Sequence, residues 1–372
     1  MIYFDNAATS YPKPDCVKNA VLSFIRDRCG NPGRGGHTLA MKAAETVYET
    51  RKKLARSFGV SDPSLVCFTG SCTEALNTAI FGRLSRGDVV ITSNLEHNSV
   101  RRPLIAAGCR VLEFDALEDE NGILEQVDTL ISRGARALVC TCASNVLPVV
   151  LPYNGLGRLC RDRGVLFIAD GAQAAGHADI DVVRDNTDIL CIPAHKGLFG
   201  IPGCGAMIFS PSYDFEKHRP LLYGGSGVNS AEPGMPDYPP ERFEAGTLPT
   251  AAIASLSAGL DFVNRVGIGK ISQRERDISE RILKNAAKYA TFYHPAPGSL
   301  LCFNVGSIPC ERTAELLNKY GVCARAGMHC APGAHKYTAP DESGAVRISF
   351  SYLNSEEEAD RFCEILEHIS GS

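Results

Sequence analysis

The sequence predicts an α/β fold built on a mostly parallel seven-stranded sheet, followed by a smaller α/β domain. Between about residues 65 and 210, short β-rich apolar runs alternate with segments of helical spacing, and Gly, Asn or Asp marks each junction. Several runs are apolar throughout, as expected for strands that are buried on both faces. The predicted strands are 65–69, 88–93, 110–114, 136–142, 165–169, 188–192 and 205–210.

The remaining segments predict how the rest of the chain is organised. A helix is expected at 73–84, and residues 222–249, with a Gly-Gly-Ser-Gly run and five prolines, predict a long ordered loop. Helices at 251–266, 271–289, 312–320 and 356–369 and strands at 300–305, 322–325 and 345–350 follow. We therefore expect a large domain, 15–250, and a small domain, 251–372, with residues 1–14 packing on the small one.

Composition and charge exclude several classes of protein. With 44% hydrophobic and 22% charged residues, the chain has the composition of a soluble globular protein. A net charge of −4 gives no basic face for nucleic acid, and no apolar stretch approaches the roughly 20 residues that span a bilayer. The odd total of fifteen cysteines, many inside apolar runs, favours reduced thiols. We expect a cytoplasmic protein without membrane or nucleic-acid partners.

Two residues suggest pyridoxal 5′-phosphate (PLP) chemistry. Asp170 ends the apolar run 165–170, and Lys196 follows His195 directly after another predicted strand. A lysine can hold the PLP aldehyde as a Schiff base, and an aspartate can keep the pyridine nitrogen protonated. Alone, such a lysine is usually a surface residue and such an aspartate a turn former or helix cap. Their combination at two strand ends favours the cofactor.

The junction at 69–74 predicts a phosphate site. Backbone N–H groups near Cys72 and the Thr73 hydroxyl would meet at the N-terminus of the helix at 73–84. The alternative is a simple capping box completed by Glu74. Lys196, farther along the chain, favours phosphate.

Three more polar residues follow predicted strands. Gln173 can reach the phenolic oxygen of PLP, and His195 can donate to its phosphate. His97 can stack on the ring and move protons, although a histidine after a strand is more often an ordinary hydrogen-bonded loop residue.

Two residues are candidates for gripping a carboxylate. Arg347 interrupts an alternating strand pattern, and a guanidinium binds carboxylates with two parallel hydrogen bonds. Asn145 follows the strand at 136–142 and would assist. The alternative is an arginine on the surface of an edge strand.

Cys330 is the candidate nucleophile. His329, Arg325 and small residues surround it, which favours a partly exposed, reactive thiol that can attack sulfur. A buried structural cysteine is one alternative. A zinc site built from Cys323, His329, Cys330 and His335 is another, but neither CxxC nor HxxxH spacing is present, so no metal is predicted.

With these motifs the sequence resembles, nearly end to end, the class V aminotransferase superfamily of PLP enzymes, and specifically the cysteine desulfurases. The segment around Cys330 is more similar to the group whose persulfide cysteine lies on a short ordered lobe, which includes selenocysteine lyase-like enzymes. The motifs that carry the resemblance are DNAAT at 5–9, NPGRGGH at 31–37, EH at 96–97, SNVL at 144–147, DGAQ at 170–173, HK at 195–196, EAGT at 244–247 and RAGMHC at 325–330.

The resemblance implies a homodimer of the PLP-dependent transferase fold type I and assigns a role to each candidate. The cofactor would be bound by Lys196, His97, Asp170, Gln173, His195, Cys72 and Thr73, and by Thr247, which would reach the phosphate in the partner subunit. The substrate would be bound by Asn145, Arg347, His37 and Arg325.

The implied reaction converts L-cysteine to L-alanine. Lys196 takes the Cα proton, Cys330 accepts the sulfur as a persulfide, and an acceptor protein removes it. Selenocysteine lyase and aminotransferase activities remain alternatives, and the latter would leave Cys330 idle. A non-catalytic binding protein is a further alternative, because Pro193 stands where relatives commonly carry a phosphate-binding serine and Pro249 where asparagine is usual.

Overall fold

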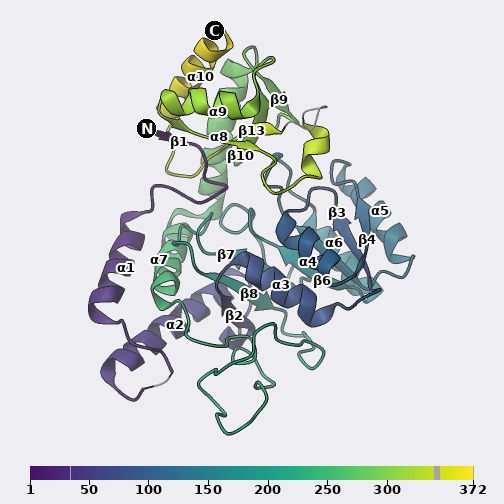
Figure 1. Ribbon diagram of the computed structural model, residues 1–372, viewed down its shortest axis with the longest axis vertical. Coiled ribbons are helices and arrows are strands. Elements are labelled where there is room, and N and C mark those ends of the chain that lie inside the picture. Colours follow the sequence, from purple (N-terminus) through teal and green to yellow (C-terminus); the bar gives the residue numbers. More distant parts are fainter. Residues whose placement is uncertain (34, 339–343, 372) are drawn as a thin grey trace.

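The computed structural model describes residues 1–33, 35–338 and 344–371 (Figure 1). Arg34 of the NPGRGGH motif, residues 339–343 and Ser372 lie outside the described residues. The chain forms a large unit around a seven-stranded sheet and a smaller unit around a four-stranded sheet, which lies above the large one in the view of Figure 1.

The seven-stranded sheet confirms the predicted α/β class and the mostly parallel arrangement. The strand order is β2-β8-β7-β6-β5-β3-β4, and β8 alone runs antiparallel to its neighbours. Every residue of β5, β7 and β8 is buried, which explains why these strands are apolar throughout. The strands are β2 (Val66–Thr69), β3 (Val89–Ser93), β4 (Arg110–Phe114), β5 (Ala137–Thr141), β6 (Leu166–Asp170), β7 (Ile189–Pro193) and β8 (Gly205–Phe209).

Helices surround this sheet, and most of them share one continuous apolar core with it, whereas α1 packs through two smaller apolar clusters. α3 packs beside α4, α5 beside α6, and α7 beside both α1 and α2. The helices are α1 (Asp15–Asp27), α2 (Thr38–Ser57), the 3₁₀ helix η1 (Pro63–Leu65), α3 (Cys72–Arg83), α4 (Asn98–Ala106), α5 (Glu120–Ile131), α6 (Tyr153–Arg163) and α7 (Thr250–Val266).

The smaller unit is an antiparallel sheet of order β12-β13-β10-β9 with α8, α9 and α10. The aromatic rings of Phe4, Phe350 and Phe362 meet in its core, with centroids 5.1 and 5.8 Å from that of Phe4. The elements are α8 (Ile268–Ala286), β9 (Thr291–Tyr293), β10 (Leu300–Asn304), α9 (Cys310–Lys319), β11 (Val322–Cys323), β12 (Arg325–Gly327), the 3₁₀ helix η2 (Ala334–Tyr337), β13 (Ala345–Ser349) and α10 (Glu356–Ser370).

The N-terminal segment lies against this smaller unit. β1 (Ile2–Tyr3) pairs in parallel with β11, and a single bridge joins Asp5 to Ser349. The predicted domain boundary between residues 250 and 251 stays a prediction. Side chains of α7, which was assigned to the small domain, pack into the core of the large sheet.

Two elements differ most from the sequence prediction. The helix predicted at 271–289 is α8, which begins and ends three residues earlier. The strand predicted at 322–325 is split into β11 and β12 at Ala324, because the two halves pair with different strands, β1 and β13. Residues 222–249 contain no helix or strand, as predicted for a long loop. Over the described ranges, no helix combines the length and apolar character needed to cross a bilayer.

Candidate active site

One cavity lies where the carboxyl ends of the parallel strands meet, which is the usual ligand site of an open α/β sheet. Eight of the predicted site residues line it, and all of them follow a strand of the large sheet. The lining residues are Ser71, Cys72, Thr73, His97, Ser99, Thr141, Asn145, Asp170, Ala172, Gln173, Pro193, His195 and Lys196.

Lys196 and Asp170 provide a free amine beside a buried carboxylate. Burial lowers the pKa of Lys196, and the negative charge of Asp170 offsets part of this effect. Among the described residues, nothing accepts a hydrogen bond from the Lys196 Nζ atom. Asp170 Oδ1 accepts the Ala172 N–H at 2.9 Å and the Cys72 thiol at 3.6 Å. The neutral amine is the form of lysine that attacks a carbonyl carbon, and a lowered pKa increases the fraction of Lys196 in that form.

His195 presents a ring nitrogen without a partner. Its Nδ1 atom is buried and has no hydrogen bond within the described part of the chain. Burial, reinforced by the charges of Lys196 and Lys13, lowers the pKa of His195 to about 4. The His195 carbonyl accepts the Ser10 N–H and the Lys13 ammonium, both at 3.0 Å, so the N-terminal segment fixes this turn. This nitrogen is therefore available for a hydrogen bond to a group bound in the cavity.

The N-terminus of α3 is capped and also lines the cavity. Ser71 is its N-cap, and the Ser71 hydroxyl accepts the Glu74 N–H at 3.1 Å. Glu74 Oε2 in turn accepts the Gly70 N–H at 3.0 Å. The capping alternative is therefore correct for Ser71, while Thr73 takes no part in the cap and lines the cavity.

His97 caps α4 through its ring. Nδ1 accepts the Ser99 N–H at 3.0 Å and lies 2.8 Å from the Ser99 hydroxyl. A lone pair must therefore occupy Nδ1, which places the proton of the neutral ring on Nε2. Burial lowers the pKa of His97 and favours this neutral form.

Glu96, quoted in the EH motif without a role, fixes the turn behind His97. Its carboxyl group is fully buried and accepts the Thr141 N–H at 3.1 Å and the Ser93 N–H at 3.3 Å. Burial raises the pKa of Glu96 to about 8. The group ties the end of β3 to the end of β5, where both strands enter the cavity wall.

Arg347 is buried, which rules out the surface alternative. It lies in β13 between two neighbouring strands and is 2% exposed. One terminal nitrogen donates to Asp5 Oδ1 at 2.8 Å and the other to the Asn145 carbonyl at 2.9 Å, while Nε is buried without a partner among the described residues. Asp5 was missed as a partner because 342 residues separate it from Arg347 and no local pattern links them.

Cys330 is exposed, so it is not a buried structural cysteine. His329 and Cys330 both adopt left-handed backbone, with φ of 48° and 57°. The Cys330 carbonyl accepts the Asn98 N–H at 2.7 Å, and the His329 carbonyl accepts the Asn145 side-chain amide at 2.7 Å. The His329 and His335 rings stack, with Nδ1 and Nε2 3.2 Å apart. No cluster of three or more potential metal ligands exists in the described ranges.

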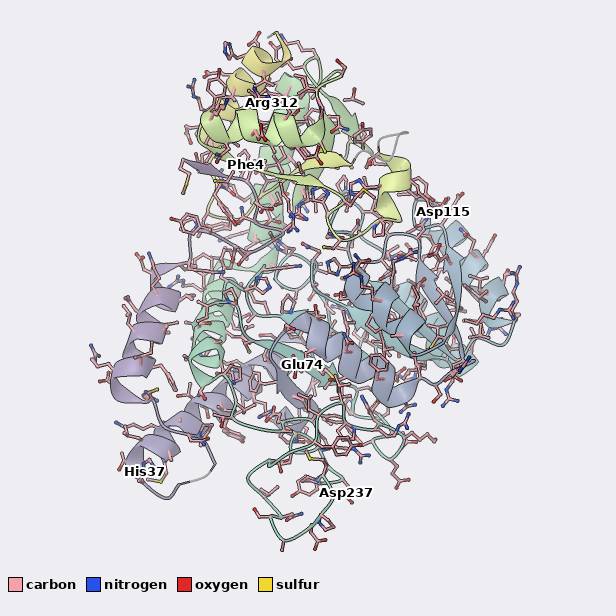
Figure 2. All side chains as sticks on the ribbon, viewed as in Figure 1. Phe4, His37, Glu74, Asp115, Asp237 and Arg312 are labelled. Carbon is pink, nitrogen blue, oxygen red and sulfur yellow. The ribbon has the colours of Figure 1, made fainter. Side chains whose placement is uncertain are left out.

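Besides Arg347 and Cys330, three more predicted residues are absent from the cavity lining. His37 is exposed and caps α2 by accepting the Ala40 N–H, and Figure 2 shows it far from the strand ends, so the expectation that it lines the pocket fails within this chain. Thr247 is exposed in the long loop. Arg325 is exposed on β12 in register with Arg347, and its positive charge contributes to the lowered pKa of His97.

Comparison with known sequences identifies relatives along the whole chain. The family described as Aminotransferase class-V matches residues 2–362. A probable cysteine desulfurase from Methanothermobacter thermautotrophicus is 31% identical over 382 residues, covering 100% of this chain and 95% of the relative. A probable cysteine desulfurase from Xylella fastidiosa is 33% identical over 380 residues, covering 98% of this chain and 90% of the relative.

Solved structures with a similar fold cover the chain equally well. The apo cysteine desulfurase from Thermococcus onnurineus NA1 superposes with a TM-score of 0.89 at 29% identity, covering 100% of this chain and 94% of that one. The cysteine desulfurase CsdA from Escherichia coli superposes with a TM-score of 0.86 at 25% identity, covering 98% of this chain and 94% of that one.

Proposed function

The chain belongs to the class-V aminotransferase family, in its cysteine desulfurase branch, and from this premise we propose how its residues carry out the reaction. The proposed enzyme is PLP-dependent, converts L-cysteine to L-alanine and leaves the sulfur as a persulfide on Cys330. The observation that supports this assignment is an exposed cysteine whose backbone segment is hydrogen-bonded to Asn98 and Asn145, together with a cavity that Asn145 and the half-buried Lys196 line.

The cavity fits PLP group by group. Lys196 supplies an amine without a hydrogen-bond acceptor for the aldehyde, and Asp170 supplies a carboxylate for the pyridine nitrogen. The unpartnered His195 Nδ1 and the N-terminus of α3 at Thr73 match an anionic phosphate. Gln173, whose Nε2 donates to the Ala7 carbonyl at 3.0 Å, would meet the phenolic oxygen.

The polar residues of the cavity divide the work of proton transfer. When bound, PLP supplies an aldehyde carbon and a conjugated ring that draws electrons from the substrate Cα. Asp170 would hold a proton at the ring nitrogen and so keep the ring electron-poor. Lys196 Nζ would take the Cα proton, for which its lowered pKa suits it. His97 would lie against the ring and would have its Nε2–H as a donor.

Arg347 and Asn145 orient the substrate. The buried Arg347 Nε atom, which has no partner among the described residues, and the second N–H of each terminal nitrogen are the donors left for the substrate carboxylate. Asp5 and the Asn145 carbonyl hold the rest of the guanidinium in place, so the donor is fixed before the substrate arrives. The exposed Arg325 adds positive charge at the entrance.

Cys330 performs the sulfur transfer. Its thiolate attacks the substrate sulfur, the new S–S bond forms as the substrate Cβ–S bond breaks, and the electron pair of that bond passes to Cβ, which takes up a proton. Cysteine is thereby reduced to alanine, and the thiol of Cys330 becomes a persulfide. An acceptor thiol then removes the outer sulfur and regenerates Cys330.

The decisive experiment compares two cysteine variants. Cys29 is the second exposed cysteine of the chain, so Cys29→Ala is the matched control for Cys330→Ala. With L-cysteine and a reducing thiol, we expect Cys330→Ala to lose at least 100-fold in alanine and sulfide formation, and Cys29→Ala to match the native enzyme. Undiminished alanine formation by Cys330→Ala would refute the persulfide mechanism.

The same variants distinguish the alternative activities. Selenium leaves carbon more readily than sulfur does, so a selenocysteine lyase would still form alanine from L-selenocysteine in Cys330→Ala. An aminotransferase would instead give a keto acid and pyridoxamine phosphate with native protein. The desulfurase, selenocysteine lyase and aminotransferase activities all require Lys196. Lys196→Ala should therefore abolish all three, together with the visible absorbance of the Schiff base between this lysine and PLP.

We propose that the enzyme works as a homodimer in which Thr247 reaches the phosphate site of the second copy. Two observations support this arrangement: Thr247 is exposed away from its own cavity, and exposed apolar side chains gather on α2 and in the long loop. They are Leu39, Met41, Tyr48, Leu222, Tyr223, Val228 and Tyr238. Thr247→Ala should weaken PLP retention without altering the dimer mass measured by light scattering, and unaltered PLP retention would contradict the proposal.

The proposed setting of the enzyme is the cytoplasm. The structure records the cysteines as reduced thiols, which suits a reducing compartment. The proposed partner is an acceptor protein whose thiol reaches Cys330.

A further inference from the structure

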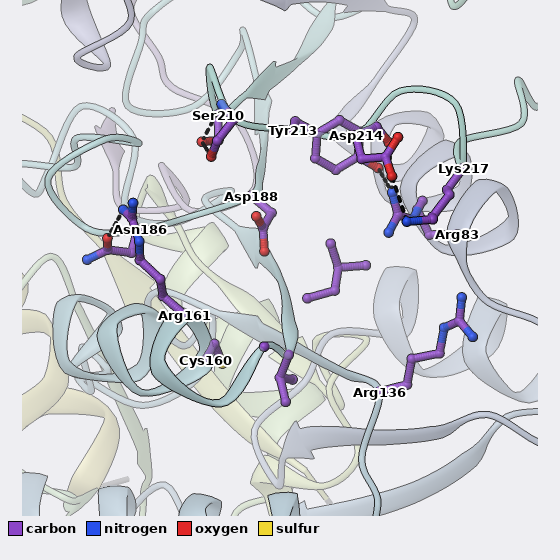
Figure 3. A pocket seen from close by; sticks show the side chains of 14 residues that line it. Arg83, Arg136, Cys160, Arg161, Asn186, Asp188, Ser210, Tyr213, Asp214 and Lys217 are labelled. Carbon is purple, nitrogen blue, oxygen red and sulfur yellow. Dashed lines mark hydrogen bonds and ion pairs between the residues drawn. The ribbon is translucent and has the colours of Figure 1, made fainter.

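A second cavity lies at the opposite edge of the large sheet from the candidate active site. It is formed where β5, β6 and β7 begin and where the antiparallel β8 ends, with the C-terminal turns of α3 and α6 beside it (Figure 3). Five-residue strands separate the two edges, which is about 16 Å at 3.3 Å per residue. Its volume of about 490 Å³ is in the range of small-molecule sites.

Cations surround this cavity. Arg83, Arg136, Arg161 and Lys217 line it, and Figure 3 shows Arg161 on one side with Arg83, Lys217 and Arg136 on the other. Two carboxylates also line it: Asp188 and Asp214. The surplus of positive charge is notable because the whole chain carries a net charge of −4.

The two carboxylates are already engaged. Asp214 pairs with Lys217 at 2.7 Å, and Asp188 accepts the Phe167 N–H at 2.8 Å. Burial raises the pKa of Asp188, while the positive charges of Arg83 and Arg161 partly oppose this rise, so Asp188 offsets part of the charge of these two arginines. One such carboxylate beside three arginines leaves a surplus of positive charge at the cavity.

Among the described residues, none of the three arginines lies closer than 3.7 Å to a carboxylate oxygen. Arg83 donates to the Tyr213 hydroxyl at 3.2 Å and the Asp214 backbone carbonyl at 3.0 Å, and its Nε is buried without a partner in the described part of the chain. Arg161 donates to the Asn186 amide oxygen at 2.7 Å, which is a neutral acceptor. The Arg136 guanidinium lies 3.7 Å from an Asp88 oxygen, at the limit of an ion pair.

Helix ends explain only part of this charge. Arg83 and Arg161 occupy the last turns of α3 and α6, where a cation offsets the helix dipole. α6 already has Arg163 for that purpose, and Arg136 and Lys217 lie on no helix. The dipoles therefore account for at most two of the four cations.

We propose that this cavity is a binding site for a small molecule that carries two or more linked phosphate groups. A single compact anion would meet the cations on one side only, whereas a chain of phosphates can contact Arg161 on one side and Arg83 and Arg136 on the other. The hydroxyls of Ser210 and Ser212, 3.0 Å apart at the rim, add neutral donors.

The test uses inorganic pyrophosphate and tripolyphosphate as probes, titrated into the PLP-loaded enzyme by isothermal calorimetry in 0.1 M NaCl. Loading with PLP keeps the probe out of the candidate active site. We expect saturable binding of both probes and at least tenfold weaker binding of orthophosphate. Absence of saturable heat up to 5 mM of either probe would overturn the proposal.

A pair of double variants separates a defined site from general attraction. Arg136→Gln with Arg161→Gln removes two lining cations, and Arg133→Gln with Arg163→Gln removes two exposed arginines that are nearby in the chain but do not line the cavity. All four arginines are exposed, so both proteins should fold. We expect at least tenfold weaker pyrophosphate binding in the first variant and less than a twofold change in the second. Equal losses in the two variants would refute a defined site.

Discussion

The buried His218 should make the folded protein acid-sensitive, and the size of the effect can be calculated. His218 is fully buried, its Nδ1 lies 2.7 Å from the Tyr213 hydroxyl, and its Nε2 lies 3.1 Å from the Thr78 carbonyl. A carbonyl only accepts, so Nε2 carries the proton and the ring is neutral. Burial lowers the pKa of His218 from 6.5 to about 3.

The sign and magnitude follow from proton linkage. Because the unfolded chain binds a proton at a higher pH than the folded chain does, the free energy of unfolding decreases as the pH falls below 6.5 and stops decreasing near pH 3. At pH 5 the unfolded histidine is almost fully protonated and the folded one is not, which corresponds to a loss of about 2 kcal/mol relative to pH 8.

Replacing His218 by glutamine should remove this contribution. Urea unfolding of PLP-loaded protein at pH 8 and pH 5 would give the decrease in free energy for native protein and for His218→Gln. We expect the decrease to be about 2 kcal/mol smaller in His218→Gln. His368→Gln, which replaces an exposed histidine on α10, should behave like native protein. An equal decrease in native protein and His218→Gln would refute the reasoning.

Two further predictions concern buried contacts near the site. Glu244 forms a buried ion pair with Arg51 at 2.8 Å, so Glu244→Ala should lower the free energy of unfolding by about 3–5 kcal/mol in urea, because an unpaired charge stays buried; a loss below 1 kcal/mol would contradict this. A Cβ atom on Gly259 would lie 2.0 Å from the Leu198 carbonyl, so Gly259→Ala should shift the turn that carries the candidate lysine and reduce PLP retained after gel filtration. Gly269→Ala, with open space around it, is the control; equal retention in both would refute the steric argument.

The fold was predictable because the large sheet has a simple pattern. Strands buried on both faces are apolar throughout, and all seven were identified from sequence within one or two residues at each end. The reversed direction of β8 has no such signal, because an antiparallel strand between two parallel ones is equally apolar. The pairing of β11 with β1 depends on contacts across more than 300 residues, which local patterns do not encode.

The candidate site was predictable where residues follow strands directly. Lys196, Asp170 and His97 each stand at the end of a buried strand, and parallel strands bring their carboxyl ends together. Asp5 was not predictable in its role, because its contact with Arg347 depends on the packing of the N-terminal segment against the small unit. His37 illustrates the opposite error, in which a motif residue lies far from the cavity of its own chain.

The hydrogen bonds around Cys330 determine the reach of its sulfur. The backbone at this residue is held by Asn98 and, through the preceding carbonyl, by Asn145, and both of these asparagines belong to the large unit. Because hydrogen bonds hold the backbone at Cys330, its sulfur atom can move little farther than rotation of the side chain allows. If Cys330 hands on sulfur as proposed, the acceptor has to bring its thiol to Cys330, and we expect an acceptor with a cysteine at the tip of a narrow protrusion to receive sulfur faster than one with a recessed cysteine.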